Sequence, residues 1–320
     1  MPENNITLDG ARKMLLDSPR TLIYTHGHPD ADTLGSALAL KLALKKAGCE
    51  AYVTCLDPIP ARLAFLADEP MPEGFEPDLV CAVDVASYMM LGIKDDSLRG
   101  RIDLKIDHHR IGEDYAKFNY TDEASAACGE IIFDLLGGDI DGEIAAPLYA
   151  AVASDTGCFR FSNTTARTHV IAARLTEYGV DTARLNHLLF ESRSVGEIAA
   201  LRLALESLEY HCGGRLAIVC FTNEDKKKYG FDDDCISAHN SLTREIEGVE
   251  LGITLRQKSN DPDAWKISMR SGESVDVSAL CGVFGGGGHI RAAGCEITAP
   301  DAKTARETIL HEAVKAFENE

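Results

Sequence analysis

Residues 21–36 read TLIYTHGHPDADTLGS and join a short apolar run to a polar turn. The run at 21–24 has the length and composition of a buried β-strand. Residues 34–46, which follow the turn, are apolar almost all round and end just before Gly48, a pattern typical of a well-buried helix with a glycine cap. A strand, a polar turn and a buried helix form the first unit of an α/β sheet. Such sheets hold ligands at the carboxyl ends of their strands.

The same alternation of apolar runs and helical patterns continues to about residue 190. Further strands are expected at residues 51–55, 79–83 and 104–106, and further helices at 124–136, 143–153 and 168–178. Because strands and helices alternate, the sequence predicts an α/β domain built on a parallel sheet with helices on both faces.

The second part of the chain has a different character. Strands are expected at residues 216–221, 251–256 and 265–269, followed by a glycine run and a helix at 302–317. Residues 195–210 have a helical period without turn signals, which indicates a connecting helix. We therefore predict a first domain over residues 1–192, a connecting helix over 193–212, and a smaller α+β domain over 213–320 that faces the first across a cleft. With 320 residues, of which 45% are apolar, the chain can bury two cores.

Composition narrows the class of partner and the compartment. The net charge of -19 would repel a long nucleic-acid backbone, so any nucleic-acid substrate should be short; the same acidic excess also serves solubility alone. The ten cysteines include no C-x-x-C pair and many lie in apolar runs, as expected of core residues in a reducing cytoplasm. No signal peptide and no apolar window of about eighteen residues occurs. We expect a soluble cytoplasmic protein without a membrane partner, and its oligomeric state stays open, a homodimer included.

Imidazoles and carboxylates gather at the predicted carboxyl ends of the strands. In chain order they are His26, Asp30, Asp32, Asp84, Asp107, His108 and His109. Successive residues of a strand point to opposite faces, so His108 and His109 reach one cavity only if the strand stops at Asp107 and the chain turns. A second interpretation stays open for two of them: Asp32 as a helix N-cap, and His26 as a hydrogen-bonded residue at a strand end.

Asp155 joins this set from the end of the helix predicted at 143–153. A carboxylate at a helix C-terminus costs a few tenths to about 1 kcal/mol, and a cation beside it would remove that cost. Four carboxylates and two imidazoles without a thiolate suit Mn²⁺ or Mg²⁺ better than structural zinc. So many carboxylates would repel one another unless about two divalent cations neutralised them. The predicted metal ligands are His26, Asp30, Asp32, Asp84, His108 and Asp155.

Four motifs in this order resemble those of the DHH phosphoesterases, although each alone is a weak signal. They are H-x-x-x-D-x-D from His26 with Gly35-Ser36, Asp84 after a strand, Asp107-His108-His109, and Ser154-Asp155-Thr156-Gly157. The resemblance implies two divalent ions, Mn²⁺ first and Mg²⁺ as the alternative. It further implies that His26 and Asp30 bind one ion, that Asp32, His108 and Asp155 bind the other, and that Asp84 bridges them. His109 would contact the substrate phosphate and Asp107 would support this loop.

The glycine run in the second part extends the resemblance to the DHH-associated C-terminal domain. Gly285 to Gly288 precede His289, and Met269-Arg270-Ser271 is similar to that domain's substrate-contacting strand. Bare backbone lets amide groups approach an anion closely, so the run is a plausible phosphate cradle; an isolated glycine run is as often a flexible turn. The predicted substrate-binding residues are His109, Arg270, Ser271, Gly286, Gly287, Gly288 and His289.

The resemblance points to the nano-RNase and pAp-phosphatase members of this family. It implies hydrolysis of short oligoribonucleotides to mononucleotides and of adenosine 3′,5′-bisphosphate (pAp) by two-metal attack of water, with Asp84, Asp107, His108 and His109 as the catalytic set. Short oligonucleotides or small nucleotides would be the partners, and long duplex nucleic acid would not. The alternatives are an exopolyphosphatase-like enzyme, a cyclic- or linear-dinucleotide phosphodiesterase, and a nucleotide-binding regulator without turnover.

Overall fold

The chain forms two compact units. In the computed structural model, which describes residues 4–93, 95–272 and 274–317, unit 1 is Met1–Ser192 and unit 2 is Arg193–Glu320. Each unit has its own sheet and its own apolar core.

Unit 1 is built on a sheet of five parallel strands in the order β2-β1-β3-β4-β5. The strands are β1 (Arg20–Tyr24), β2 (Glu50–Thr54), β3 (Leu79–Val83), β4 (Leu104–Asp107) and β5 (Phe118–Thr121). The predicted parallel sheet is therefore confirmed. The sequence did not indicate the edge strand β5, which is short and carries polar residues at alternate positions.

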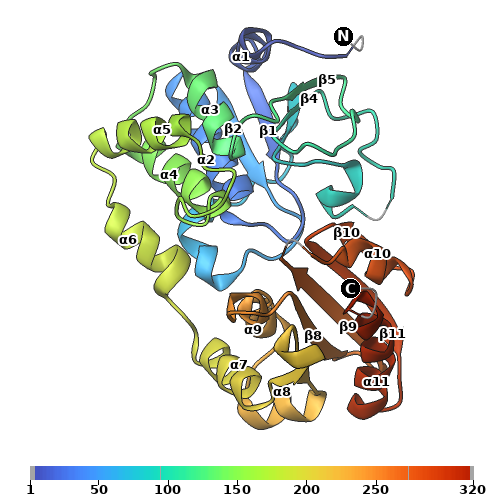
Figure 1. Ribbon diagram of the computed structural model, residues 1–320. Coiled ribbons are helices and arrows are strands. Elements are labelled where there is room, and N and C mark those ends of the chain that lie inside the picture. The colour runs from blue at the N-terminus through green and yellow to red at the C-terminus, as the bar shows by residue number, and fades with distance from the viewer. Residues whose placement is uncertain (1–3, 94, 273, 318–320) are drawn as a thin grey trace. The chain divides into compact units, whose positions relative to one another are not determined.

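Both faces of this sheet are covered, as the alternation along β3 shows. Leu79, Cys81 and Val83 pack into the main core with the α-helices, whereas Val80 and Ala82 pack in a separate cluster with the 3₁₀ helix η2. Figure 1 shows α2 to α5 gathered on one side of the sheet. The predicted helical cover is thus made by α-helices on one face and by a 3₁₀ helix with loops on the other. The helical segments of unit 1 are α1 (Leu8–Leu16), α2 (Ala31–Lys46), η1 (Ala61–Leu66), η2 (Tyr88–Leu91), α3 (Cys128–Leu136), α4 (Gly142–Asp155), α5 (Ala166–Glu177), α6 (Thr182–Asn186) and the π-helical turn η3 (His187–Glu191).

Unit 2 has a mixed sheet of six strands in the order β10-β11-β9-β8-β7-β6, in which β7 and β8 are parallel and the other neighbours antiparallel. This agrees with the predicted α+β class. The strands are β6 (Glu209–His211), β7 (Leu216–Phe221), β8 (Leu251–Lys258), β9 (Asp261–Ser271), β10 (Gly287–His289) and β11 (Ala292–Thr298).

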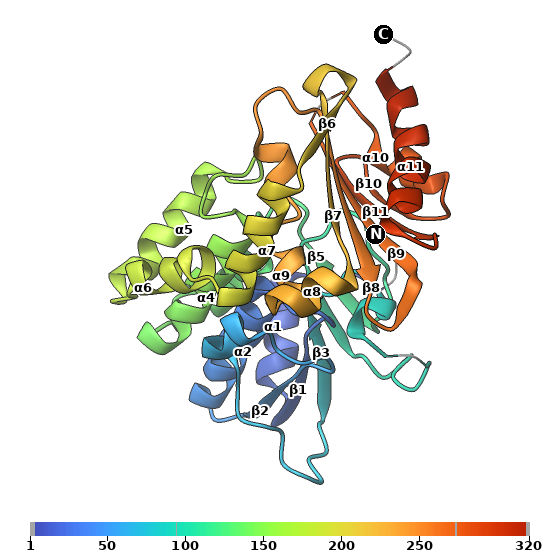
Figure 2. The same ribbon diagram turned by 90° about the horizontal axis from the view of Figure 1, so that it is seen from below.

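Helices cover both faces of the second sheet (Figure 2). Ile218 of β7 belongs to the core that contains α10 and α11, whereas Val219 packs in another cluster with Ala200 and Ala204 of α7. The helix expected to connect the domains therefore packs within unit 2, and it ends at Glu206 because the chain enters β6. The helical segments are α7 (Val195–Glu206), η4 (Cys212–Gly214), α8 (Asn223–Tyr229), α9 (Asp233–Ser237), η5 (Leu242–Glu245), α10 (Val277–Gly282), α11 (Ala302–Ala313) and η6 (Val314–Phe317).

Two simpler observations complete the fold. All ten cysteines lie in the described ranges and none forms a disulfide. Among those same residues, no helix has the length and apolar character needed to cross a membrane.

Candidate metal centre

The predicted ligands of unit 1 converge at the carboxyl ends of β1, β3 and β4. Two groups of three match the two predicted sites: His26, Asp30 and Asp84, and Asp32, His108 and Asp155. Within each group, one nitrogen or oxygen atom from every residue lies within 4.8 Å of the others. A third group joins Asp84 and His108 to His109, so Asp84 contacts both sets.

Asp30 and Asp32 are fixed by backbone amides of two helices. Asp30 is the N-cap of α2, because its Oδ1 accepts from the amides of Asp32 (3.0 Å) and Thr33 (3.1 Å). The alternative of Asp32 as N-cap was therefore wrong by two residues. Asp32 is fully buried in the first turn of α2, and its carboxylate accepts from the amides of Cys128 (2.7 Å) and Gly129 (3.0 Å) at the start of α3. These bonds orient both carboxylates without a cation.

Gly35 and Ser36, which belong to the first motif, support this arrangement. The Ser36 hydroxyl donates to Oδ1 of Asp32 at 3.0 Å. A Cβ atom at Gly35 would lie 2.4 Å from the carbonyl oxygen of Pro147, so only glycine lets α2 pack this closely on α4. The motif therefore combines one hydrogen bond to a predicted ligand with one contact between helices.

Asp84 is the central carboxylate. It follows β3 with a φ of 60°, in the left-handed region, and its amide donates to the carbonyl oxygen of Ile106 at 2.9 Å. Its Oδ2 lies 3.7 Å from Nε2 of His26, and its Oδ1 lies 3.5 Å from both Nε2 of His108 and Nδ1 of His109. A non-glycine residue at positive φ is costly, and such residues cluster at functional sites.

Both imidazoles of the predicted ligand sets present Nε2 to the carboxylates. Nδ1 of His26 lies 2.7 Å from the carbonyl oxygen of Gly27, and Nδ1 of His108 lies 3.3 Å from that of Ser125. A carbonyl can only accept, so each Nδ1 carries a proton, and in the neutral imidazole Nε2 then has a free lone pair. Metal-binding histidines in proteins are held in this way.

Unpaired buried atoms mark the middle of the cluster. Among the described residues, Asp84 Oδ1 and His108 Nε2 are buried and have no hydrogen-bond partner. A buried polar atom without a partner is costly, and a bound ion is one explanation of such an atom. The residues therefore fit a pair of divalent cations.

The charges of the cluster support the same interpretation. Burial, followed by the charges of Asp32, Asp30, Asp155 and Asp107, raises the pKa of Asp84 well above its usual range. Burial raises the pKa of Asp32 to about 6, against the lowering effect of His108. Burial and the charges of Asp32 and Asp30 raise the pKa of Asp155 to about 9. Cations would lower these pKa values and remove the repulsion.

Asp107 holds the histidine pair. The strand β4 ends at Asp107 and the chain turns there, as the sequence required. Oδ1 of the fully buried Asp107 lies 2.8 Å from Nδ1 of His109 and accepts from the amides of His108 (2.9 Å) and His109 (3.3 Å). The hydrogen bond to Asp107 raises the pKa of His109 in spite of partial burial. His109 is the most exposed histidine of the cluster, and its Nε2 is free of this bond.

In unit 2, Arg270 and His289 lie in one row across the sheet. Ala292 of β11 pairs with Arg270 of β9 on one side and with His289 of β10 on the other. Paired residues point to the same face, and neighbouring strands are about 4.8 Å apart, so both basic side chains share a face at a backbone separation of about 10 Å. Burial and the nearby charge of Arg244 lower the pKa of Arg270. Within the described residues Arg270 forms no ion pair with a carboxylate, so its charge is available to an anion.

The second half of the glycine run is a strand: Gly287 and Gly288 belong to β10, whereas Gly285 lies in the turn that precedes it. A Cβ atom at Gly286 would lie 2.3 Å from the carbonyl oxygen of Gly294, and one at Gly288 would lie 2.6 Å from that of Ala292. These glycines therefore let β10 approach β11. The amide of Gly286 donates to the carbonyl oxygen of Cys281 at 2.9 Å, so it is not free for a phosphate. Gly287 is exposed, and a Cβ atom there would meet no other atom within 4 Å.

Ser271 uses its hydroxyl inside the fold, and its contact with the substrate stays a prediction. Its side chain is buried, and its hydroxyl donates to the carbonyl oxygen of Val275 at 2.6 Å. That hydrogen bond stabilises the turn after β9. Because the hydroxyl is engaged inside the fold, we leave Ser271 out of the substrate-binding set below.

Comparison with known proteins assigns the chain to a family. The model of the DHH family, N-terminal domain, matches residues 20–154, and the model of the DHHA1 domain matches residues 201–319. The chain is 32% identical to a protein of Thermus thermophilus named bifunctional oligoribonuclease and PAP phosphatase NrnA, over 92% of this chain and 88% of that protein. The chain belongs to the DHH family. The predicted DHH phosphoesterase, a hydrolase of phosphate esters, is thereby confirmed at the level of family and enzyme class.

Two further relatives agree with this membership. A Streptococcus mutans protein named probable bifunctional oligoribonuclease and PAP phosphatase NrnA is 28% identical over 85% of this chain and 88% of its own length. A solved structure described as an exopolyphosphatase-related protein from Bacteroides fragilis has a TM-score of 0.85 at 21% identity and covers 98% of this chain and 97% of its own. At that identity, the second likeness concerns the fold alone.

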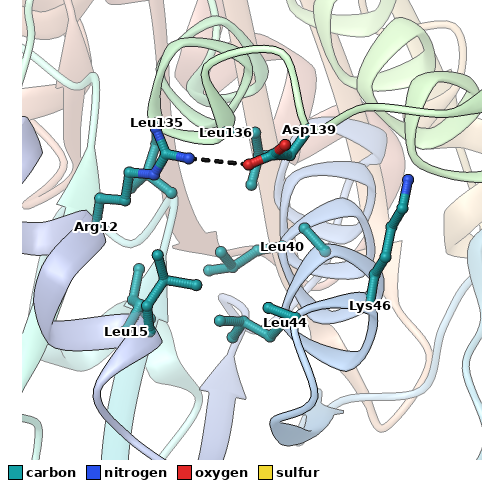
Figure 3. Close-up of a pocket in the computed structure, with 11 residues that line it drawn as sticks. Arg12, Leu15, Leu40, Leu44, Lys46, Leu135, Leu136 and Asp139 are labelled. Atoms are coloured by element: carbon teal, nitrogen blue, oxygen red, sulfur yellow. Dashed lines mark hydrogen bonds and ion pairs between the residues drawn. The ribbon is translucent and has the colours of Figure 1, made fainter.

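An apolar hollow in unit 1 lies away from the polar cluster. It has a volume of about 300 Å³ between α1, the second half of α2 and the end of α3, and leucines form most of its wall (Figure 3). Arg12 and Asp139 form an ion pair of 3.0 Å at its rim. Asp30 and Asp32 lie at the opposite end of α2, and none of the predicted site residues lines the hollow. We therefore assign the chemistry to the polar cluster.

Two residues near the site were missed by the motifs. Arg244 of η5 adds positive charge near Arg270. Lys105 is almost fully buried in β4, two residues before Asp107. A lysine between Leu104 and Ile106, inside an apolar strand, was the available signal.

Proposed function

We propose that the protein hydrolyses short oligoribonucleotides to mononucleotides and removes a phosphate from adenosine 3′,5′-bisphosphate. Two divalent cations, Mn²⁺ in first place, would assist the reaction. One observation supports the proposal: two groups of three buried or half-buried side chains lie together, Asp84 of the first group is 3.5 Å from His108 of the second, and both residues carry a buried atom without a hydrogen-bond partner among the described residues.

His26 and Asp30 would hold one cation, and Asp32, His108 and Asp155 the other, with Asp84 between them. When bound, such cations activate a water molecule and offset charge on the phosphoryl oxygens. The fixed orientation of the ligands supports this assignment, because Asp30 and Asp32 accept helix amides and both Nε2 atoms already face the carboxylates.

His109 would donate from Nε2 to a phosphoryl oxygen. Its Nδ1 is held by Asp107, and this carboxylate favours the protonated imidazole, which can donate from both nitrogens. Asp107 would then act by positioning His109 and the His108 amide, and not by contact with the substrate.

Unit 2 would bind the part of the substrate that does not react. Arg270 offers a guanidinium without a carboxylate partner among the described residues, and His289 lies on the same face in the same row. A guanidinium can hold a second phosphate with two hydrogen bonds. A dinucleotide or pAp offers such a second phosphate. The relatives named oligoribonuclease and PAP phosphatase support this choice.

The test is release of mononucleotides and phosphate from four substrates in parallel: a ribodinucleotide, a longer RNA, pAp and inorganic polyphosphate. Each is incubated with Mn²⁺, with Mg²⁺ and after chelation. We expect cleavage of the dinucleotide and pAp that is strongest with Mn²⁺ and absent with chelator.

Two variants sharpen this assay. Asp84→Ala should abolish cleavage. Asp103→Ala, which removes a carboxylate directly before β4 and so at the amino end of that strand, should not. Preference for polyphosphate would favour the exopolyphosphatase alternative. Binding of pAp without turnover under any metal would contradict the proposal and favour a regulator.

A further inference from the structure

A buried lysine lies behind the histidine pair. Lys105 and Asp107 are two residues apart in β4, so they point to the same face of the sheet. Their exposed fractions are 2% and 0%, and Nζ of Lys105 lies 3.7 Å from Oδ2 of Asp107. A buried charge is costly unless it is paired, so this pair requires an explanation.

The two oxygens of Asp107 have separate surroundings. Oδ1 faces His108 and His109 and takes all three of their hydrogen bonds. Oδ2 is buried and has no hydrogen-bond partner among the described residues, and Lys105 is the cation beside it. The lysine therefore acts on the carboxylate from the side opposite to the histidines.

Lys105 itself is held firmly. Its Nζ donates to the carbonyl oxygen of Glu113 at 2.9 Å, lies 3.9 Å from Oδ1 of Asp114, and lies 5.8 Å from the centre of the Tyr115 ring. These groups belong to the loop that follows the histidine pair. A fixed cation between that loop and Asp107 limits the movement of both.

We propose that Lys105 is a positioning residue for the phosphoesterase reaction: its ammonium group holds the Asp107 carboxylate, and through it His108 and His109, in their working orientation. The inference rests on the proposed function. Lys105 touches neither the substrate nor a cation in this scheme. It acts through Asp107.

The first test is Lys105→Met, which keeps the length of the side chain and removes its charge. Loss of a residue that orients ligands commonly costs about 10- to 100-fold in activity, and we expect a fall of that size in kcat on a ribodinucleotide with Mn²⁺, with KM within about threefold. Lys105→Arg, which keeps the charge, should recover part of this loss.

Lys41→Met is the matched control. Lys41 is also 2% exposed and also pairs with carboxylates, Asp68 and Glu69, but it lies in the second half of α2. Its substitution should lower the midpoint of thermal unfolding and leave kcat within about twofold. An equal fall in kcat for both lysines would mean that loss of any buried ion pair suffices, and it would overturn the inference.

A double-mutant cycle separates positioning through Asp107 from general support of the fold. If Lys105 acts through Asp107, Lys105→Met should have little further effect on kcat in a protein that already carries Asp107→Asn. If the two losses multiply, the inference is wrong. The double variant lacks both buried charges. If Lys105→Met alone does not fold, the effect of the lysine is measured by comparing the double variant with Asp107→Asn.

A readout without turnover keeps this inference distinct from the proposed function. The proton on Nδ1 of His109, assigned by its loss in His109→Gln, is followed by NMR in protein loaded with Mg²⁺. Its resonance should shift or disappear in Lys105→Met and stay in place in Lys41→Met. Absence of all cleavage by the unaltered protein would refute the proposed function, and the NMR result would still decide the role of Lys105. An unchanged resonance in Lys105→Met would overturn the inference that Lys105 positions Asp107 and the histidine pair.

Discussion

Asp84→Asn should raise the stability of the metal-free protein while it removes activity. Asparagine has nearly the shape of aspartate and tolerates the positive φ at this position, so the backbone should not change. The variant removes a carboxylate whose pKa is raised first by burial and then by the charges of the neighbouring carboxylates. A loss of function accompanied by a gain of stability is the signature of a carboxylate that is present for a cation.

The size of the gain follows from the spacing of the charges. Ligand atoms of Asp30 and Asp84 lie within 4.8 Å of each other, and two unit charges at that distance repel by about 3 kcal/mol at an effective dielectric constant of about 20. Partial protonation of Asp84 already relieves part of this repulsion, so we expect Asp84→Asn to gain about 1–2 kcal/mol in the free energy of unfolding. For a domain of this size that raises the unfolding midpoint by about 2–8 °C.

The assay is thermal unfolding with chelator and with Mn²⁺, beside turnover of a ribodinucleotide. The unaltered protein should gain stability from Mn²⁺, and Asp84→Asn should gain much less. Turnover should fall at least about 100-fold, because loss of several kcal/mol of charge stabilisation has that effect.

Asp103→Asn serves as the control carboxylate, since Asp103 is largely buried but accepts from Lys117 (2.7 Å) and from the Val80 amide (2.9 Å). It should lower the midpoint in chelator and keep the response to Mn²⁺. If Asp84→Asn behaves like this control, or keeps more than about a tenth of the turnover, the reasoning about the cluster is refuted.

Three other predictions concern pH, packing and substrate. In chelator, the unfolding midpoint should fall as pH rises from about 4 to 9. The reason is that Asp32 and Asp155, with pKa values of about 6 and about 9 in the folded protein, keep protons that the unfolded chain has released. Asp155→Asn should flatten this slope, and an unchanged slope would contradict the raised pKa of Asp155. Gly35→Ala should cost about 1–3 kcal/mol in urea unfolding, because its Cβ would lie 2.4 Å from a backbone oxygen of Pro147, and an unaltered urea midpoint would disprove that contact. Arg270→Gln should raise KM for a ribodinucleotide about 10-fold or more through loss of a charged hydrogen bond, whereas Arg202→Gln on the exposed side of α7 should not. Equal KM values would remove Arg270 from the set of substrate-binding residues.

The fold of unit 1 was readable because buried strands and helices follow simple patterns. The strand at 79–83 was predicted without error, since it is apolar throughout and flanked by charged residues. The helix predicted from residue 34 begins at Ala31, because Asp30 and not Asp32 supplies the cap. Short edge strands such as β5 and β10 carry little apolar signal, and their pairing depends on neighbours far away in the sequence.

The sequence indicated the site residues at the ends of strands better than it indicated which side chains are engaged by the surrounding backbone. Strand-end carboxylates could be foreseen because parallel strands bring their carboxyl ends to one edge. Ser271 illustrates the limit: the motif suggested a substrate contact, but the turn after β9 uses its hydroxyl. Whether a hydroxyl is free depends on the backbone around it, which one motif does not specify. The supporting role of Asp107 was foreseen, but its partner Lys105 required the structure.

The hydrogen bonds of Asp30 and Asp32 bear on how this protein could change during evolution. Both carboxylates start a helix, α2 or α3, in addition to facing the cluster. Replacing either would harm folding as well as chemistry, so purifying selection would act on them even in a descendant that had lost its enzymatic role. Among the described residues, no amide at a helix start donates to the side chain of Asp84 or Asp155. A lineage drifting toward a non-enzymatic function should therefore lose these two first, and the order of loss among paralogues would record that history.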